Sequence, residues 1–488
     1  MVILLSLALL SSGVYDYTPI TRNLDPGYVP DTREDYLSSR PPYVPLEVTP
    51  VSGEARGTQF LVVLTESVAD SLAPGLLDQW MADIQAEGLT VSAVELTWSS
   101  PEEIRAWLSG LHSEGLEGVV LVGDVPSAWA ALEDYADERS NETFPTDYFY
   151  WDLDGDWTDA WTGYPSGGVP GPDGIYDGWS GDLFPEIYVG RILTHVILNG
   201  NQYQLLNDYL TRLHQWRLEG DPDPHALCYV DDDWSGWGVG YRNSMKLLYT
   251  EVELVSQVDS TNGTDYRQNR LPAGYTWISP FVHSGPTVHQ WSPGPSTTSG
   301  HIWTDQPPSR FYNLFACSNA RFTSNWCMGC VYVFGTQTGL AAVGSTKSGA
   351  MLQFNQFYGP LGQGDTFGTA MFKWWEYIQQ GGFSQVEMYW HLGMTILGDP
   401  TIVPAMHFLS VEGTPAPTPL LLIGPNPVSG AAAVNITGTG LISVFDISGR
   451  RIAEGFSSLN LAGLAPGVYL VRAESGAESV TGRFTVVR

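Results

Sequence analysis

Basic side chains are scarce in this sequence. Its 488 residues carry 22 Lys and Arg against 53 Asp and Glu, which gives a formal net charge of −31, and Lys occurs only at positions 246, 347 and 373. Nucleic acids and anionic membrane surfaces would repel such a chain, so we expect neither as a partner. Hydrophobic residues make up 43% of the chain, which indicates a folded protein rather than a solvated acidic tail.

Cysteines and long apolar runs are also few. The four cysteines, at 228, 317, 327 and 330, do not suffice for a disulfide scaffold, so each is judged by its surroundings. No run reaches the roughly 18 apolar residues of a membrane helix, and we expect no membrane span in the mature protein. The run Met1–Gly13 is shaped like a signal peptide but lacks the usual positive start; a buried strand is the alternative.

The length predicts two to four domains. Residues 14–55, rich in Pro, Tyr and Asp, predict an extended leader packed over a domain, or a cleavable pro-segment. Residues 406–422 form a Pro/Thr/Gly linker. Before the linker we expect a first α/β subdomain with an acidic loop (56–225) and a catalytic α/β subdomain (226–405). After it we expect an Ig-like β-sandwich at 423–488.

Apolar strands alternate with amphipathic helices before the linker. Strands are predicted at 60–64, 91–96 and 118–123, and helices at 73–87 and 101–112. This alternation predicts a parallel, doubly wound sheet flanked by helices, with ligand sites at the carboxyl ends of its strands. The loop Gly123–Pro126 follows one such end.

The C-terminal segment has a different pattern, with short strands predicted at 434–436, 441–445, 468–472 and 483–487. Its motifs Pro425–Pro427, Val444–Arg450 and Leu464–Val471 resemble the C-terminal sorting domain of the type IX secretion system. The resemblance implies that the type IX machinery exports the protein, which is then secreted or held at the cell surface. A generic Ig-like binding module is the alternative.

Two reactive side chains follow apolar strands. His283 comes just after Ile278–Val282, and Cys317 just after Asn313–Ala316. Two strand ends of one parallel sheet place both side chains on the same edge, where imidazole can take the proton of a thiol nucleophile. The alternative is an inert, buried cysteine.

These residues stand within a longer pattern that resembles the gingipain family of cysteine peptidases, from about Phe60 to Pro404. The resemblance implies a caspase-like fold, a mostly parallel sheet flanked by helices in two subdomains. The motifs that carry it are Leu121–Asp124, Thr146–Tyr150, Asp152–Asp156, Phe184–Arg191, Ala342–Thr346 and Leu397–Pro400.

The resemblance implies that Cys317 is the nucleophile, that His283 is the general base and acid, and that Glu186 orients the imidazole. A salt bridge to Arg191 is the alternative role for Glu186. Backbone N–H groups of Cys317 and of Ser284 or Gly285 are the natural oxyanion donors. Ser284 departs from the family, in which Gly directly follows His, and an inactive relative stays open. His289 is a second candidate base, although its context is typical of a groove or surface position.

Carboxylates alternate along a Gly-containing loop, in the manner of sites for hard cations. Calcium, in a structural role, is the natural occupant outside the cell, although the spacing does not match an EF-hand. A solvated acidic loop is the alternative. The candidate ligands are Asp152, Asp154, Asp156, Asp173 and Asp177.

Cys327 and Cys330 have C-x-x-C spacing without a second pair, which favours a local disulfide or two packed thiols; Cys228 is expected in a strand core. No acidic residue follows Gly190–Arg191, so basic specificity does not carry over from the family. Trp291, Trp303 and Trp326 are candidates for an apolar pocket or for the core.

Together these features predict a secreted cysteine endopeptidase that hydrolyses peptide or protein substrates through an acyl-thioester intermediate. Two alternatives stay open. One is a catalytically inactive surface adhesion or binding protein on a peptidase scaffold, and the other is a sortase-like transpeptidase that passes the acyl group to an amine.

Overall fold

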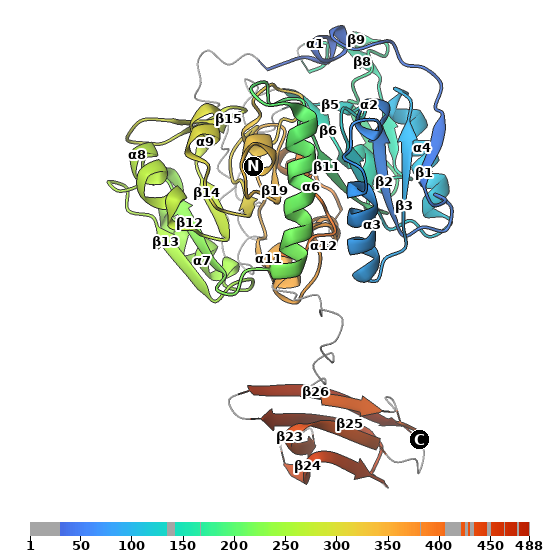
Figure 1. Cartoon of the computed structure of the whole chain (residues 1–488), viewed down its shortest axis with the longest axis vertical. Helices are drawn as coiled ribbons and strands as arrows, with labels where there is room; N and C mark the ends of the chain where they lie inside the picture. Colours follow the sequence, from blue (N-terminus) through green and yellow to red (C-terminus); the bar gives the residue numbers. More distant parts are fainter. Residues whose placement is uncertain are drawn as a thin grey trace, which may run out of the picture. The chain divides into compact units, whose positions relative to one another are not determined.

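The computed structural model describes residues 30–133, 142–165, 167–380 and 382–405, and residues 421–487 except 425–427, 430–433, 447–449, 463 and 476–477. The chain divides into two compact units, Met1–Phe408 and Leu409–Arg488 (Figure 1). The predicted signal peptide, Met1–Gly13, and the motif Pro425–Pro427 lie outside the described residues.

An eleven-stranded sheet forms the centre of the first unit. Its pairs are mostly parallel, although β1 is antiparallel to β3 and β20 is antiparallel to β19, and it runs through both expected subdomains. The α/β prediction is therefore confirmed. The strand order is β1 (Val48–Ser52), β3 (Val91–Leu96), β2 (Phe60–Thr65), β4 (Gly118–Val122), β11 (Tyr188–Ile192), β20 (Met394–Gly398), β19 (Ala341–Ser345), β18 (Phe311–Asn313), β14 (Trp277–Phe281), β12 (His225–Val230) and β13 (Glu251–Val255).

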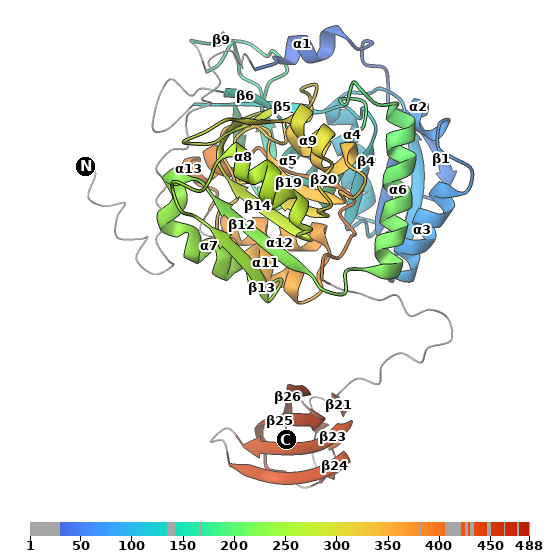
Figure 2. The same ribbon diagram turned by 60° about the vertical axis from the view of Figure 1, so that its left-hand side comes forward.

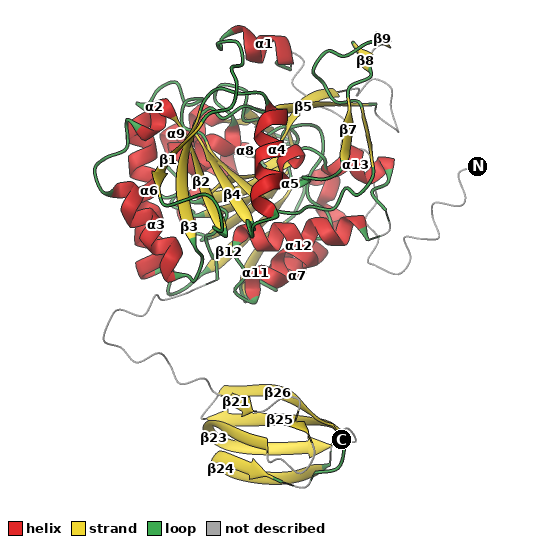
Figure 3. Cartoon of the chain, turned by 90° about the vertical axis from the view of Figure 1, so that its right-hand side faces the viewer, coloured by secondary structure: helices red, strands yellow, loops and turns green. Residues whose placement is uncertain are grey.

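Helices cover both faces of this sheet, which is why its central strands are apolar on both sides. Figure 3 shows α3 and α6 on one face and α4 and α12 on the other. The helices are α1 (Arg33–Ser38), α2 (Glu66–Ala69), α3 (Leu76–Ala86), α4 (Pro101–His112), α5 (Tyr148–Trp151), α6 (Gln202–Glu219), α7 (Gly238–Met245), α8 (Gly263–Asp265), α9 (Ser299–Asp305), α10 (Met328–Cys330), α11 (Asn355–Gly362), α12 (Phe367–Gln379) and α13 (Gln385–His391).

Local sequence explains where the predicted helices begin. Helix α4 has the predicted bounds, because the Ser100 hydroxyl accepts a hydrogen bond from the Glu103 N–H and Pro101 occupies the first turn. Helix α3 begins at Leu76, three residues later than predicted. Gly75, at φ 81°, directly precedes it in a left-handed conformation that ends the loop.

Part of the expected leader belongs to the first unit. Strand β1 lies at the edge of the sheet, and three side chains fasten residues 30–47 to the domain. Arg321 donates to the Asp31 carboxylate at 2.6 Å, Arg33 donates to the Asp173 carbonyl at 3.1 Å, and Arg40 donates twice to Asp124 at 2.7 and 2.9 Å. In the loop Gly123–Pro126, where a ligand site was predicted, the Asp124 carboxylate therefore binds Arg40 of the N-terminal segment.

Short strand pairs surround the acidic loop: β5 (Ala128–Leu132) with β6 (Glu142–Thr146), β7 (Asp156–Thr158) with β10 (Gly178–Ser180), and β8 (Trp161–Thr162) with β9 (Val169–Pro170). A further small sheet follows β14 and contains β15 (His283–Gly285), β16 (Val288–Gln290) and β17 (Thr297–Thr298). Figure 2 shows β14 and β12 beside the helices that cover them.

The second unit is all-β, as predicted. Its strands are β21 (Leu421–Gly424), β22 (Val428–Ser429), β23 (Val434–Asp446), β24 (Arg451–Leu461), β25 (Gly467–Ser475) and β26 (Glu478–Val487). The order is β21-β23-β25-β26-β22, and β24 pairs with β23. The two strands predicted at 434–436 and 441–445 are one strand, whose register to β24 shifts between Thr437 and Leu441, where two glycines lie. The sequence analysis did not predict β24.

Candidate active site

Strands β14 and β18 are parallel neighbours, and the loops after them carry His283 and Cys317. The two loops stay together beyond the strands. The Val282 N–H donates to the Phe315 carbonyl at 3.1 Å, and the Ser284 hydroxyl donates to the Cys317 carbonyl at 2.8 Å. The structure therefore brings the predicted nucleophile and base onto adjacent loops at one edge of the sheet, and Ser284, the departure from the family pattern, links them.

Cys317 is buried, with 1% of its surface exposed. Burial raises the pKa of its thiol to about 11, against smaller opposing effects of the Gly349 backbone and the Lys347 ammonium. The next residue, Ser318, has φ 58°, and its N–H donates to the Lys347 carbonyl at 2.8 Å. A left-handed residue therefore turns the chain directly after the thiol.

The imidazole of His283 has a carboxylate partner that the sequence analysis did not identify. Its Nε2 lies 2.7 Å from Asp233 Oδ2, and its ring centroid lies 4.6 Å from that of Trp234. Asp233 and Trp234 belong to the short 3₁₀ helix η4 (Asp232–Trp237), which follows β12. The sequence shows three consecutive aspartates after an apolar strand, but only the structure shows that this strand neighbours β14.

Glu186 lies in a different environment from the one predicted. Its carboxylate accepts a hydrogen bond from the Leu153 N–H at 2.5 Å, and its oxygen atoms lie near those of Asp152 and Asp154. The carboxylate bonded to His283 is that of Asp233. Arg191 forms its ion pair with Asp147, at 2.6 Å, rather than with Glu186. Glu186 therefore bonds to the Leu153 N–H, and the predicted partners, His283 and Arg191, pair with Asp233 and Asp147 instead.

His289 is buried rather than in a groove or at the surface, which corrects the sequence analysis. It lies on β16 opposite Ser284, and its Nε2 is 3.2 Å from the Tyr332 hydroxyl. Burial lowers the pKa of His289 to about 3. Such an imidazole stays neutral at physiological pH and belongs to an aromatic core.

Comparison with known proteins identifies the families of the two units. Residues 54–405 match the model of peptidase family C25, and residues 423–487 match that of the secretion system C-terminal sorting domain.

The chain belongs to peptidase family C25.

Among solved structures, this C25 chain is similar to the Arg-specific cysteine proteinase gingipain R, at 14% identity and a TM-score of 0.49, covering 90% of this chain and 100% of that one. A calcium-binding mutant of Bacteroides uniformis beta-glucuronidase 2 matches at 10% identity and a TM-score of 0.12, covering 62% of this chain and 38% of that one. No curated protein matches the chain.

The sorting domain identifies the C25 protein as a secreted or cell-surface protein and implies the type IX machinery as a partner. Family membership implies protein substrates. Within the described residues, no helix has the length and apolar character that crossing a membrane requires.

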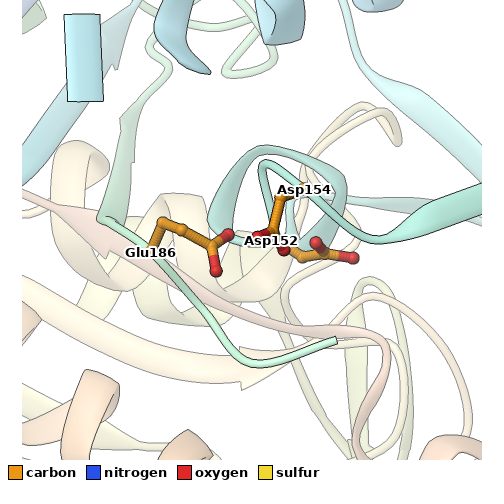
Figure 4. Close-up of side chains that lie close together, drawn as sticks. All are labelled: Asp152, Asp154 and Glu186. Carbon is orange, nitrogen blue, oxygen red and sulfur yellow. The ribbon is translucent and has the colours of Figure 1, made fainter. Parts of the chain in front are cut away.

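The acidic loop of the C25 domain assembles only part of the predicted cation site. Asp152 and Asp154 lie with Glu186, and one oxygen of each carboxylate lies within 4.8 Å of the others (Figure 4). Asp173 instead accepts the Gly163 N–H at 2.9 Å, and Asp177 accepts the Trp161 N–H at 2.6 Å. These two, together with Asp156 on β7, are outside the group of three.

Charge and burial fit this group to a cation. Burial raises the pKa of Glu186 to about 7, and the negative charges of Asp154 and Asp152 add to the effect. Asp152 already has partners, because its carboxylate accepts hydrogen bonds from the Gly155 N–H and the Trp157 indole and lies 3.2 Å from Arg105. The residues that would hold calcium are thus Asp154 and Glu186, with Asp152 as a shared ligand.

The remaining candidates lie in the core or beside the site. Cys228 is a buried residue of β12, as predicted, and Cys327 and Cys330 are buried free thiols. Trp291 is buried, whereas Trp303 and Trp326 are half-buried. The rings of Trp303 and Trp326 pack edge to face, with their centroids 5.9 Å apart. A cavity of about 470 Å³ lies beside Trp303; Leu205, Arg212, Phe334 and Thr336 also line it.

Proposed function

We propose that this C25 chain is a secreted cysteine endopeptidase in which Cys317 attacks the peptide carbonyl, His283 carries the proton and Asp233 orients the imidazole. The observation that carries the proposal is the joining of the two loops by the Ser284–Cys317 hydrogen bond, together with the contact between His283 and Asp233. Asp233 takes the orienting role that the sequence analysis gave to Glu186.

The hydrogen bonds of the imidazole suggest which nitrogen does the chemistry. With Nε2–H donating to Asp233, Nδ1 keeps its lone pair, and this buried nitrogen has no hydrogen-bond partner among the described residues. Nδ1 is therefore the atom that would take the thiol proton. Because burial raises the pKa of Cys317 to about 11, the resting site holds a thiol, and the proton moves as the sulfur attacks.

The reaction then has two stages. The sulfur adds to the carbonyl, and backbone N–H groups of Cys317 and of Ser284 or Gly285 would stabilise the oxyanion. The intermediate collapses, His283 returns the proton to the leaving amine, and an acyl-thioester remains on Cys317. Water, deprotonated by His283, attacks the thioester and releases the carboxylic acid and the thiol.

One observation favours the inactive alternative, a binding protein on a peptidase scaffold, because Cys317 is almost fully buried. Labelling distinguishes the two. If the site is active, iodoacetamide alkylates Cys317 in the native protein. The product is read in the tryptic peptide 311–321, in which Cys317 is the one cysteine. Peptide hydrolysis that Cys317→Ala abolishes and the core control Cys228→Ala preserves supports the proposal. Unchanged hydrolysis in Cys317→Ala overturns it.

We also infer that the cluster Asp152, Asp154 and Glu186 binds calcium and braces the loop before β11. What supports this is the mutual repulsion of three nearby carboxylates, of which Arg105 offsets only one. Calcium would supply charge neutralisation and rigidity there and takes no part in hydrolysis. Calcium titration of the thermal midpoint, with magnesium as the control, tests the inference.

A further inference from the structure

The C-x-x-C segment at residues 327–330 has a geometry that brings its two thiols together. Cys327 is the N-cap of α10 and Cys330 is the third residue of the same helix, which continues into the π-helical turn η7 (Val331–Gly335). N-cap and third-residue side chains lie on the same side of the first helical turn, where in a capping box each reaches the backbone N–H of the other residue. This protein shows that relationship elsewhere, with reciprocal hydrogen bonds at Thr32 and Asp35, Thr298 and His301, and Ser384 and Glu387.

The two thiols influence each other. Burial and the neighbouring Cys327 thiol raise the pKa of the Cys330 thiol, and both residues are fully buried. Two side chains at the N-cap and third position of one helical turn are within the range that a disulfide spans.

This segment also holds the two catalytic loops together. The carbonyl of Asn319, two residues after Cys317, accepts hydrogen bonds from the Cys327 thiol at 3.2 Å and from the Gly329 N–H at 2.8 Å. The Met328 N–H donates to the Pro286 carbonyl at 2.7 Å, three residues after His283. The Asn319 side-chain amide donates to the Gly285 carbonyl at 2.5 Å. Residues 327–329 therefore connect the loop of the nucleophile to the loop of the base.

We propose that Cys327 and Cys330 form a disulfide in the exported protein, and that this bond fixes the segment joining the two catalytic loops. Oxidation removes the Cys327 thiol proton and with it the hydrogen bond to Asn319, so the backbone N–H groups of Met328 and Gly329 keep the segment joined to both loops. The sorting domain gives the protein an export route through compartments that favour disulfides. In the reaction, one thiolate attacks an external disulfide, of a dithiol oxidant or a small-molecule thiol, and releases a thiol. The second thiolate then displaces the remaining partner, so that two thiols of the protein are oxidised as one external disulfide is reduced.

The bond would form during folding, because the finished domain leaves neither sulfur accessible. It involves neither Cys317 nor Cys228, so Cys317 keeps its thiol. The disulfide goes beyond the proposed function, and its chemistry does not depend on whether the protein hydrolyses peptides.

Peptide mapping of the exported full-length protein tests the bond directly. Alkylation in denaturant without reductant, followed by trypsin, places Cys327 and Cys330 alone in peptide 322–347, Cys317 in 311–321 and Cys228 in 218–242. We expect peptide 322–347 to lack both alkyl groups and to be two hydrogens lighter than its reduced form, while the other two are alkylated. Full alkylation of 322–347, or a disulfide to Cys228 or Cys317, overturns the proposal.

Thermal stability provides a second measurement. Refolding with a dithiol reductant should lower the midpoint of the wild-type protein by about 2–4 °C relative to refolding under oxidising conditions. Cys327→Ser/Cys330→Ser should show no difference between the two conditions, and Cys228→Ser should keep the wild-type difference. An equal midpoint for oxidised and reduced wild-type protein would contradict a stabilising bond even if the bond forms. Loss of peptidase activity with an intact disulfide would count against the proposed function alone.

Discussion

Asp233 Oδ2 lies 2.7 Å from His283 Nε2, and the two residues follow neighbouring parallel strands, β12 and β14. The carboxylate is largely exposed, with 63% of its side chain accessible, whereas the imidazole is 12% exposed. An exposed carboxylate on a short helix thus accepts the Nε2–H of a largely covered imidazole and favours that tautomer.

We expect Asp233→Asn to lower kcat about 10- to 100-fold with little change in KM, because the amide can stabilise the wrong tautomer of His283. Asp233→Glu should recover part of the loss. Steady-state kinetics across pH 5 to 9 check this, since a positioning role changes the pH profile and a purely structural role does not. Asp259→Asn, an exposed change after the neighbouring strand β13, is the control. Equal kcat in Asp233→Asn and wild type would contradict the role.

The adjacency of the loops that carry His283 and Cys317 was predictable from the sequence. His283 and Cys317 each follow an apolar run, and parallel strands place their carboxyl ends at one edge. The bounds of α4 and β3 were equally predictable, because a cap, a proline and an apolar run mark them locally.

The partner of His283 was not predictable in the same way. Family resemblance pointed to Glu186, and choosing Asp233 requires knowing that β12 is the strand beside β14, a long-range pairing that no local pattern encodes. The set of carboxylates that lie together in the acidic loop was not predictable for a related reason. Asp173 and Asp177 share the acidic character of Asp152, but they accept the backbone N–H groups of Gly163 and Trp161, respectively. Charge spacing alone does not reveal which carboxylates already have backbone donors.

A second prediction concerns the buried ion pair of Arg191. Its guanidinium donates to Asp147 at 2.6 to 3.0 Å, and both side chains are at most 1% exposed. Asp147→Asn leaves the buried cation uncompensated and should lower the free energy of unfolding by about 3–5 kcal/mol. Urea unfolding measures this loss. Asp365→Asn, which removes the partner of the exposed Lys373, should cost less than about 1 kcal/mol. Equal losses in the two variants would refute the argument.

A third prediction concerns the N-terminal segment. Burial alone would raise the pKa of Asp31, but the charge of Arg321 and hydrogen bonds from Thr323, Arg321 and Ser324 outweigh it and lower the pKa. The stability from this contact is therefore present above the unfolded pKa and is lost as the pH falls. Asp31→Asn should lower the unfolding free energy by about 1–3 kcal/mol at pH 7, and the difference should shrink towards pH 3.

Glu34→Gln, an exposed change on α1, is the matched control and should have little effect. The comparison also bears on the leader, since residues that can be removed as a pro-segment would contribute no such stability. If truncation before β1 left the midpoint of thermal unfolding unchanged, the contact of Asp31 with Arg321 would contribute nothing to stability.

The last prediction concerns how the stability contributed by the acidic cluster Asp152, Asp154 and Glu186 depends on pH. Burial, with the charges of Asp154 and Asp152, raises the pKa of Glu186 from 4.5 to about 7, so between these values the folded state binds a proton that the unfolded state does not. The resulting stability is present below pH 4.5 and is lost as the pH rises through 7. Glu186→Gln keeps the acceptor for the Leu153 N–H without the charge. Allowing for the partial exposure of the group, it should be about 1–3 kcal/mol more stable than wild type at pH 8 and similar near pH 4.5.

At pH 8, calcium should make the wild-type protein more stable than Glu186→Gln, the reverse of the order without calcium. A cation bound by Asp152, Asp154 and Glu186 favours their charged forms, so saturating calcium should stabilise the wild-type protein and raise its midpoint, while Glu186→Gln gains much less. The effect of calcium should also weaken as the pH falls below 7, because protons compete for the same carboxylate. Urea unfolding at pH 5 and pH 8, with calcium or with a chelator, measures all four combinations. A calcium effect of equal size in wild type and Glu186→Gln would place the cation elsewhere, because a cation held by this carboxylate must lose affinity when its charge is removed.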